Sequence, residues 1–196
     1  MVTLSVVVSI YNTMPDLQRT LDSIHNQDYQ DMEVICVDDC STDTSPNCIE
    51  QFCMKDSRFI HIRNSSNMGL HMARKVGVER ANGKYIWLGD GDDTLPNNCC
   101  SKLIEKMNDS AVDILHFGSI VINEGNLPSE RVSKMQSFVN AYDGKLNGSD
   151  IFEKCFKSGE YKFSAWNKLY EASLLKKAFA LMADGAFKAQ DKYEYF

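Results

Sequence analysis

Short apolar runs alternate with polar loops and amphipathic stretches over roughly the first ninety residues of the chain. Runs rich in β-branched residues begin near Leu4, Met32, Phe59 and Tyr85, and a helical pattern follows each of them. This spacing is typical of βαβ units, in which successive strands are parallel and helices cover the sheet. The pattern therefore predicts an α/β fold with a doubly wound, mainly parallel sheet.

The individual elements can be assigned from the same pattern. Residues 4–10 are apolar almost throughout, as expected of a central strand covered on both faces. Further strands are predicted over residues 32–37, 59–62 and 85–88. Helices are expected after Pro15, over 45–52 and 70–81, and from Pro96 to about Met107.

Beyond residue 100 the regular period is lost. We expect a strand over 113–122, a polar excursion with several glycines to about 149, and helical structure over 150–177. The chain of 196 residues is long enough for one full domain with a substantial core. It stops at an aromatic segment without a polar tail, so we expect it to be the N-terminal part of a longer protein.

Charge and cysteine content narrow the function classes. Lys and Arg total 21 against 27 Asp and Glu, and no basic block is present, so nucleic acid is not expected as a partner. The seven cysteines include no C-x-x-C pair and are expected to be reduced cytosolic thiols. No signal peptide or run of eighteen apolar residues is seen, so we expect a cytoplasmic protein without a transmembrane segment.

Unusual polar residues follow the predicted strands. In an open parallel sheet, ligands bind beyond the carboxyl ends of the strands, where helix N-termini and loop amides converge. Any one loop would be weak evidence, because Asp and Asn are ordinary turn and cap residues, as at Asp43 and Asn67. Four loops converge here, with Ser9, Tyr11, Asn12, Asp38, Asp39, Asn67, Arg74, Asp90, Asp92 and Asp93.

The acidic residues predict a cation site. Carboxylates gathered at one edge would repel a bare diphosphate, and a divalent cation reverses the sign of that interaction. Mg²⁺ or Mn²⁺ takes oxygen ligands, commonly one or two carboxylates together with substrate phosphates. Asp90 and Asp92 supply such carboxylates on a turn that Gly91 keeps open. Asp39 is suited to accept hydrogen bonds from a base or a ribose, and Tyr11 offers a ring for stacking.

Five segments of the chain carry a resemblance to a known family. They are SVVVSIYN at 5–12, LDSIHNQ at 21–27, EVICVDDCSTD at 33–43, NMGL at 67–70 with Ala73 and Arg74, and GKYIWLGDGDD at 83–93. These segments resemble glycosyltransferase family 2, whose members are inverting enzymes with the GT-A fold of nucleotide-diphospho-sugar transferases. The resemblance is close over residues 4–95 and weaker over 166–196. Cys40 replaces a usual glycine, and Gly89 stands where a bulkier residue is common.

The resemblance implies roles for the site residues. Ser9, Tyr11 and Asp39 would line the nucleoside pocket, with Asn12, Asp38, Asn67 and Arg74 also on the nucleotide side. Asp90 would reach ribose and metal, and Asp92 would hold the metal, as the family's DXD motif.

The catalytic base is expected near the end of the chain. The family carries a Glu-Asp pair whose Asp deprotonates the acceptor hydroxyl, and the matching place reads Gln190-Asp191, so Asp191 is the candidate. Residues 166–170 resemble the segment that shapes the acceptor pocket.

The implied reaction is a single displacement with inversion from a nucleotide-diphosphate sugar, with uridine as the base by family habit. Residues 1–100 would form the donor half of one catalytic domain and 101–196 the acceptor-side half. The acceptor would be a glycan or a lipid-linked saccharide in bacterial surface polysaccharide synthesis, at the cytoplasmic face of the membrane.

Three alternatives remain at this point. The spacing of Asp90, Asp92 and Thr94 also matches haloacid-dehalogenase-type phosphatases, although their motif lies on the first strand of the domain. A sugar nucleotidyltransferase would need a Gly-rich basic loop where residues 11–14 read YNTM. A non-catalytic nucleotide-sugar-binding module is the third.

Overall fold

The computed structural model describes residues 2–125, 127–161 and 164–182. Its centre is a six-stranded sheet in the order β3-β2-β1-β4-β6-β5. The strands are β1 (Leu4–Ile10), β2 (Met32–Asp38), β3 (Phe59–Arg63), β4 (Tyr85–Asp90), β5 (Ile114–His116) and β6 (Lys168–Glu171). Strands β1 to β4 pair in parallel, whereas β6 runs antiparallel to both of its neighbours, β4 and β5.

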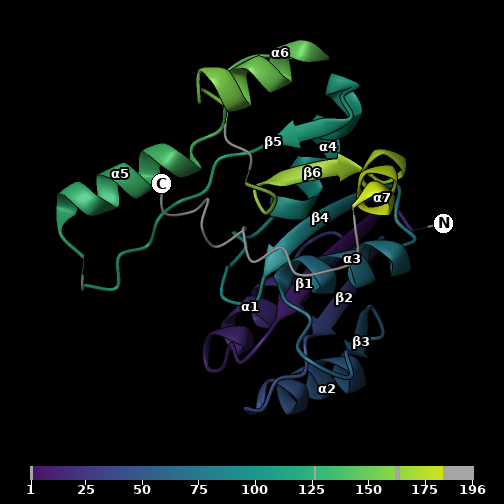
Figure 1. Ribbon diagram of the computed structural model, residues 1–196. Coiled ribbons are helices and arrows are strands. Elements are labelled where there is room, and N and C mark those ends of the chain that lie inside the picture. The colour runs from purple at the N-terminus through teal and green to yellow at the C-terminus, as the bar shows by residue number, and fades with distance from the viewer. Residues whose placement is uncertain (1, 126, 162–163, 183–196) are drawn as a thin grey trace.

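Helices cover both faces of this sheet, as Figure 1 shows. The cluster on one face contains side chains of α1 (Asp16–His25), α2 (Ser45–Lys55) and α4 (Cys99–Ser110), and the cluster on the other contains those of α3 (Leu70–Arg80) and α7 (Ala172–Leu181). All seven residues of β1 are buried, with Val6 and Val8 packed in the first cluster and Val7 in the second. The doubly wound, mainly parallel sheet predicted from the sequence is confirmed.

The second half departs from the predicted elements. The strand expected over 113–122 is limited to β5, because the backbone that follows bonds to a helix. Ser119 donates its amide to the Val139 carbonyl at 3.0 Å, and the Val121 amide donates to Gln136 Oε1 at 2.9 Å. Both acceptors lie on α5 (Ser129–Val139), which has no buried residue.

Residues 150–177 are not continuously helical either. They contain the end of α6 (Ser149–Phe152), the π-helix η1 (Glu153–Lys157), strand β6 and the start of α7. Strand β6 forms because its Leu169 pairs with Trp87 of β4, and the Trp87 indole N–H donates to the Trp166 carbonyl at 2.6 Å. Pairing with a strand some eighty residues away overrides the local helical pattern.

The cysteines and the helix lengths complete the description. All seven cysteines are free thiols. Over the ranges that the structure describes, no helix is both long and apolar enough to span a bilayer.

Candidate functional site

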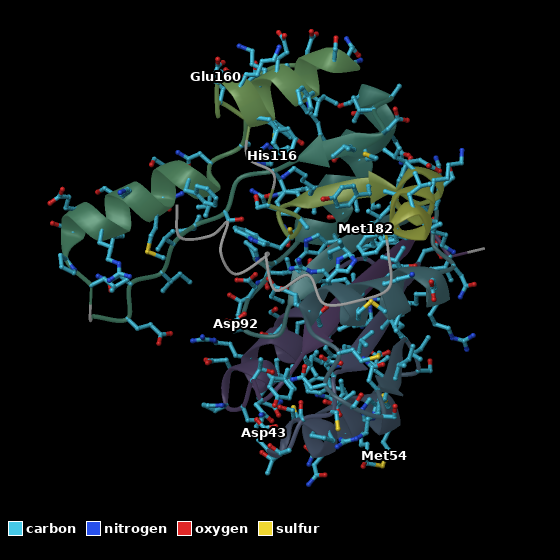
Figure 2. The ribbon with its side chains drawn as sticks, in the orientation of Figure 1. Asp43, Met54, Asp92, His116, Glu160 and Met182 are labelled. Atoms are coloured by element: carbon cyan, nitrogen blue, oxygen red, sulfur yellow. The ribbon has the colours of Figure 1, made fainter. Side chains whose placement is uncertain are left out.

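The site lies at the carboxyl ends of β1, β2 and β4. The register places Ser9 of β1 beside Val37 on one side and Asp90 on the other. The loops that leave these three strands therefore start next to one another. Figure 2 shows Asp43 and Asp92, from two of these loops, on the same edge of the molecule.

The loop after β4 concentrates negative charge. Arg74, buried on α3, donates to Asp90 Oδ1 at 2.7 Å. Loss of solvent, followed by the charge of Asp90, raises the pKa of Asp92. The same two causes, together with Asp92, raise the pKa of Asp93 to about 7. A bound cation would reverse the part of these pKa shifts that comes from repulsion between the carboxylates.

The two carboxylates after β2 are buried and bonded by the protein itself. Asp38 accepts from the Ser41 amide at 2.8 Å and from Arg63 Nη1 at 2.7 Å. Asp39 accepts from Asn64 Nδ2 at 2.7 Å and from the amides of Met68 and Gly69 at 3.0 and 2.7 Å. Asp38 thereby shapes its own loop, and Asp39 fixes the turn that leads into α3.

The loop after β1 is tied to the loop after β2. Asn12 has a left-handed backbone, with φ of 52°, and its Oδ1 accepts from the amides of Thr42 and Asp43 at 2.8 and 3.2 Å. Tyr11 beside it is 47% exposed, so its ring is open to a ligand. Cys40, where the family has glycine, also has a positive φ, of 65°, which explains the family's preference at that position.

Several buried polar atoms near these loops lack a hydrogen-bond partner within the described part of the chain, Thr13 Oγ1 among them. Ser9 Oγ is buried without a hydrogen bond, and so is Arg74 Nε. Buried polar atoms are nearly always satisfied, so unpaired ones beside a ligand edge favour a bound molecule or water there. Asn67, by contrast, is exposed, and its Oδ1 accepts from the Gly69 amide at 3.1 Å.

The sequence interpretation missed several residues that build this edge. Arg63 ends β3 and could have been found by the strand-end rule that selected the others. Asp43, by contrast, is indicated by the sequence as a turn or cap residue, and it accepts from the Met14 and Ser45 amides at 3.1 and 2.9 Å. Two residues of α1 also affect the pKa of Asp92, which the charge of Asp16 raises and that of Arg19 lowers. No spacing rule indicates these two residues. The candidate base Asp191 and its neighbour Gln190 lie outside the described residues.

The donor groups suit a hard cation that also binds substrate. Within the described ranges, no three His, Cys, Asp or Glu side chains converge to hold a metal. Asp90 and Asp92 would therefore supply only part of a coordination sphere. Magnesium and manganese are commonly held this way, with the remaining ligands coming from phosphates and water.

The chain is similar to known glycosyltransferases over most of its length. The family model described as Glycosyl transferase family 2 matches residues 5–177. Glycosyltransferase GlyA of Streptococcus pneumoniae serotype 4 is 32% identical over 178 residues, which are 88% of this chain and 25% of that protein. The GalNAc(5)-diNAcBac-PP-undecaprenol beta-1,3-glucosyltransferase of Campylobacter jejuni is 31% identical over 167 residues, 84% of this chain and 52% of that protein.

Solved structures show the same fold. Residues 1–349 of S. aureus TarS, in complex with UDP, align with a TM-score of 0.74 and 23% identity, over 97% of this chain and 53% of that one. The mannosyltransferase PcManGT from Pyrobaculum calidifontis, in complex with GDP-Man and Mn²⁺, aligns with a TM-score of 0.63 and 18% identity, over 89% and 46% of the two chains. The predicted GT-A fold is confirmed. The chain spans a quarter to about half the length of the two relatives named above.

Proposed function

The chain belongs to glycosyltransferase family 2, and from this premise we propose that it carries the donor site of a metal-dependent, inverting glycosyltransferase. The donor is a nucleotide-diphosphate sugar, with UDP as the nucleotide. The observation that carries the proposal is the crowding of Asp90, Asp92 and Asp93 beside the loops of β1 and β2. Loss of solvent, followed by the charge of the neighbouring carboxylates, raises the pKa of Asp92 and Asp93, and this acidic cluster is suited to a cation and a diphosphate.

Each loop has a part in donor binding. Tyr11 stacks on the base, and Asp39, in the loop after β2, accepts from a base N–H or a ribose hydroxyl. Ser9 Oγ and Arg74 Nε offer hydrogen-bonding capacity that the described protein does not use. Asn12 and Asp38 act by holding the two loops in place, and Asn67 lies at the entrance.

The cation is Mn²⁺ or Mg²⁺, held by Asp90 and Asp92. When bound, it supplies Lewis-acid stabilisation of the negative charge on the departing diphosphate. Arg74 fixes the Asp90 carboxylate through its 2.7 Å contact, so that one ligand is oriented before the ion binds.

The acceptor is a hydroxyl of a glycan or of a lipid-linked saccharide in bacterial surface polysaccharide synthesis. The Campylobacter relative is named for an undecaprenol-linked acceptor, which supports this class. The protein then works at the cytoplasmic face of the membrane.

Asp191 is the general base of the proposed reaction. It takes the acceptor proton while the hydroxyl displaces the nucleoside diphosphate at the anomeric carbon in one step. Asp191→Asn is expected to lower turnover by roughly 10²–10⁴-fold, the usual contribution of a general base, with donor affinity nearly unchanged. Unchanged turnover in a kinetic assay would assign the base elsewhere.

The donor site is tested by calorimetric titration of UDP and UDP-sugars with and without manganese. Manganese-dependent binding is expected for the wild type and lost in Asp92→Ala. Asp109→Ala, at an exposed carboxylate on α4, is the control and should bind as the wild type does. The absence of nucleotide binding under every condition would contradict the proposal.

Two alternatives give different results. A non-catalytic nucleotide-sugar-binding module would bind the donor in the same titration but neither hydrolyse nor transfer its sugar. The haloacid-dehalogenase-type phosphatase has no support from the family membership, and aspartyl-phosphate trapping at Asp90 would be its signature.

A further inference from the structure

Helix α1 and the residues just after its C-terminus are hydrogen-bonded to the segment that begins with the acidic loop. Thr20 Oγ1 donates to the Gly91 carbonyl at 3.0 Å, and the Leu95 amide donates to Ser23 Oγ at 3.0 Å. Gln27 Nε2 donates to the Pro96 carbonyl at 3.0 Å, and its Oε1 accepts from the Cys100 amide at 3.1 Å. We call Thr20, Ser23 and Gln27 the α1 ladder. Thr20 and Ser23 are three residues apart on one face of α1, and Gln27 follows the helix, two residues past its last residue, His25.

Two members of the α1 ladder are buried polar side chains. Thr20 on α1 is 1% exposed, and Gln27, just beyond the end of that helix, is 2% exposed. The apolar Leu21 and Ile24 of α1 are buried as well. A buried amide or hydroxyl is costly unless it is bonded, and these groups find their partners on the 91–100 backbone. The helix and the segment therefore keep one relative position, because a shift would leave several buried groups unpaired.

The contact reaches the peptide between the two proposed metal ligands. Gly91 lies between Asp90 and Asp92, and its carbonyl accepts from Thr20. A Cβ at Gly91 would be 3.0 Å from Thr13 Oγ1 and 3.3 Å from the Ser9 carbonyl, so this peptide is also held tightly against the loop after β1. The positions of Asp90 and Asp92 thus depend on α1 as well as on β4.

We propose that the α1 ladder positions the acidic loop for metal-dependent donor binding, with Thr20, Ser23 and Gln27 as positioning residues that do not contact the donor. The inference rests on the proposed function. Since the described protein offers fewer than three converging metal ligands, the spacing of Asp90 and Asp92 decides whether ion and diphosphate bind together. Residues that orient metal ligands from outside the coordination sphere typically contribute about 10–100-fold to metal affinity.

The ladder itself is tested without any ligand, by hydrogen exchange of the 91–100 amides. Ser23→Ala should speed exchange at Leu95, and Gln27→Met should speed it at Cys100, because each removes the acceptor of that amide. Gln18→Met is the matched control: Gln18 lies on the same helix but bonds to Asp22 and Cys48, so exchange over 91–100 should not change. Unchanged exchange in both ladder variants would overturn the proposal.

The functional role is tested by UDP titration with and without manganese. Thr20→Val and Gln27→Met should weaken manganese-dependent binding by about 10-fold or more, within the range typical of residues that orient metal ligands. Binding without the metal should stay as in the wild type, a difference that a general loss of stability would not produce. Thr20→Ser keeps the hydroxyl and should restore the affinity, and Gln18→Met should leave it unchanged.

The outcomes separate the two proposals. Manganese-dependent binding that stays intact in both Thr20→Val and Gln27→Met overturns the positioning role while the proposed donor site stands. A wild-type chain without manganese-dependent binding counts against the proposed function, and hydrogen exchange then decides whether the α1 ladder fixes the loop.

Discussion

His116 is held in its neutral form by its surroundings. Its Nδ1 accepts from the Tyr142 amide at 3.2 Å, and its ring lies edge-on to Tyr161 at 5.1 Å between centroids. Burial, followed by the charge of Lys168, lowers the pKa of His116 to about 4. Because an unfolded histidine titrates near 6.5, the folded state binds fewer protons between about pH 6.5 and 4, and stability falls as the pH drops through that window.

The prediction for His116 follows from this sign. His116→Gln removes the titrating group, so the wild type should lose its stability advantage over the variant between pH 7.5 and 4.5. Urea-unfolding midpoints of both proteins across this range measure the effect. A gap that stays constant with pH would show that His116 titrates alike in the folded and unfolded states.

Also at the residue scale, the spacing of apolar and polar residues in the sequence locates the strand ends but does not assign a role to every polar residue that follows them. It selected Asp38 and Asp39 alike, although Asp38 Oδ2 accepts from Arg63 and Asp39 accepts from the start of α3. These partners are 25 or more residues distant in sequence. Whether a carboxylate is bonded within the protein depends on such tertiary contacts, which a strand-end pattern does not contain.

At the scale of elements, the first half of the chain forms the predicted strands and helices because βα units bury their apolar faces against elements that are near in sequence. The second half does not follow the predicted elements. Strand β6 pairs with β4 and β5, and α5 is hydrogen-bonded to the segment after β5, for which the sequence predicts a strand. Residues 168–171 are too few for a period to show, and their apolar positions fit a helix equally well.

The place of β6 in the sheet makes a measurable prediction. Leu169 is fully buried beside Trp87, so Leu169→Ala should destabilise the protein by about 2–5 kcal/mol, as expected for a truncated core side chain. Leu181 on α7 is 89% exposed, and Leu181→Ala should change stability by less than about 0.5 kcal/mol. Denaturant unfolding of both variants gives the comparison, and equal costs would contradict the assignment of β6 to the core.

At the scale of the whole molecule, β4 joins the two halves of the chain. It pairs with β1 on the donor side and with β6 on the other, and Asp90 ends it. The crowded carboxylates therefore lie where the expected donor and acceptor halves meet, on a chain whose net charge is −6. A bound diphosphate would add negative charge at this point, and a bound cation would offset it.

Cation and nucleotide should consequently stabilise the fold cooperatively. Each relieves repulsion that opposes the other, and such coupling is reciprocal, so manganese and UDP together should raise the unfolding temperature by more than the sum of their separate effects. A ligand at 100 times its Kd adds about 2.7 kcal/mol, which for a chain of this size is roughly 5–10 °C. Thermal unfolding with neither, either and both ligands measures the excess. Asp92→Ala should abolish it and Asp109→Ala should retain it, whereas strictly additive shifts in the wild type would mean that metal and nucleotide bind independently.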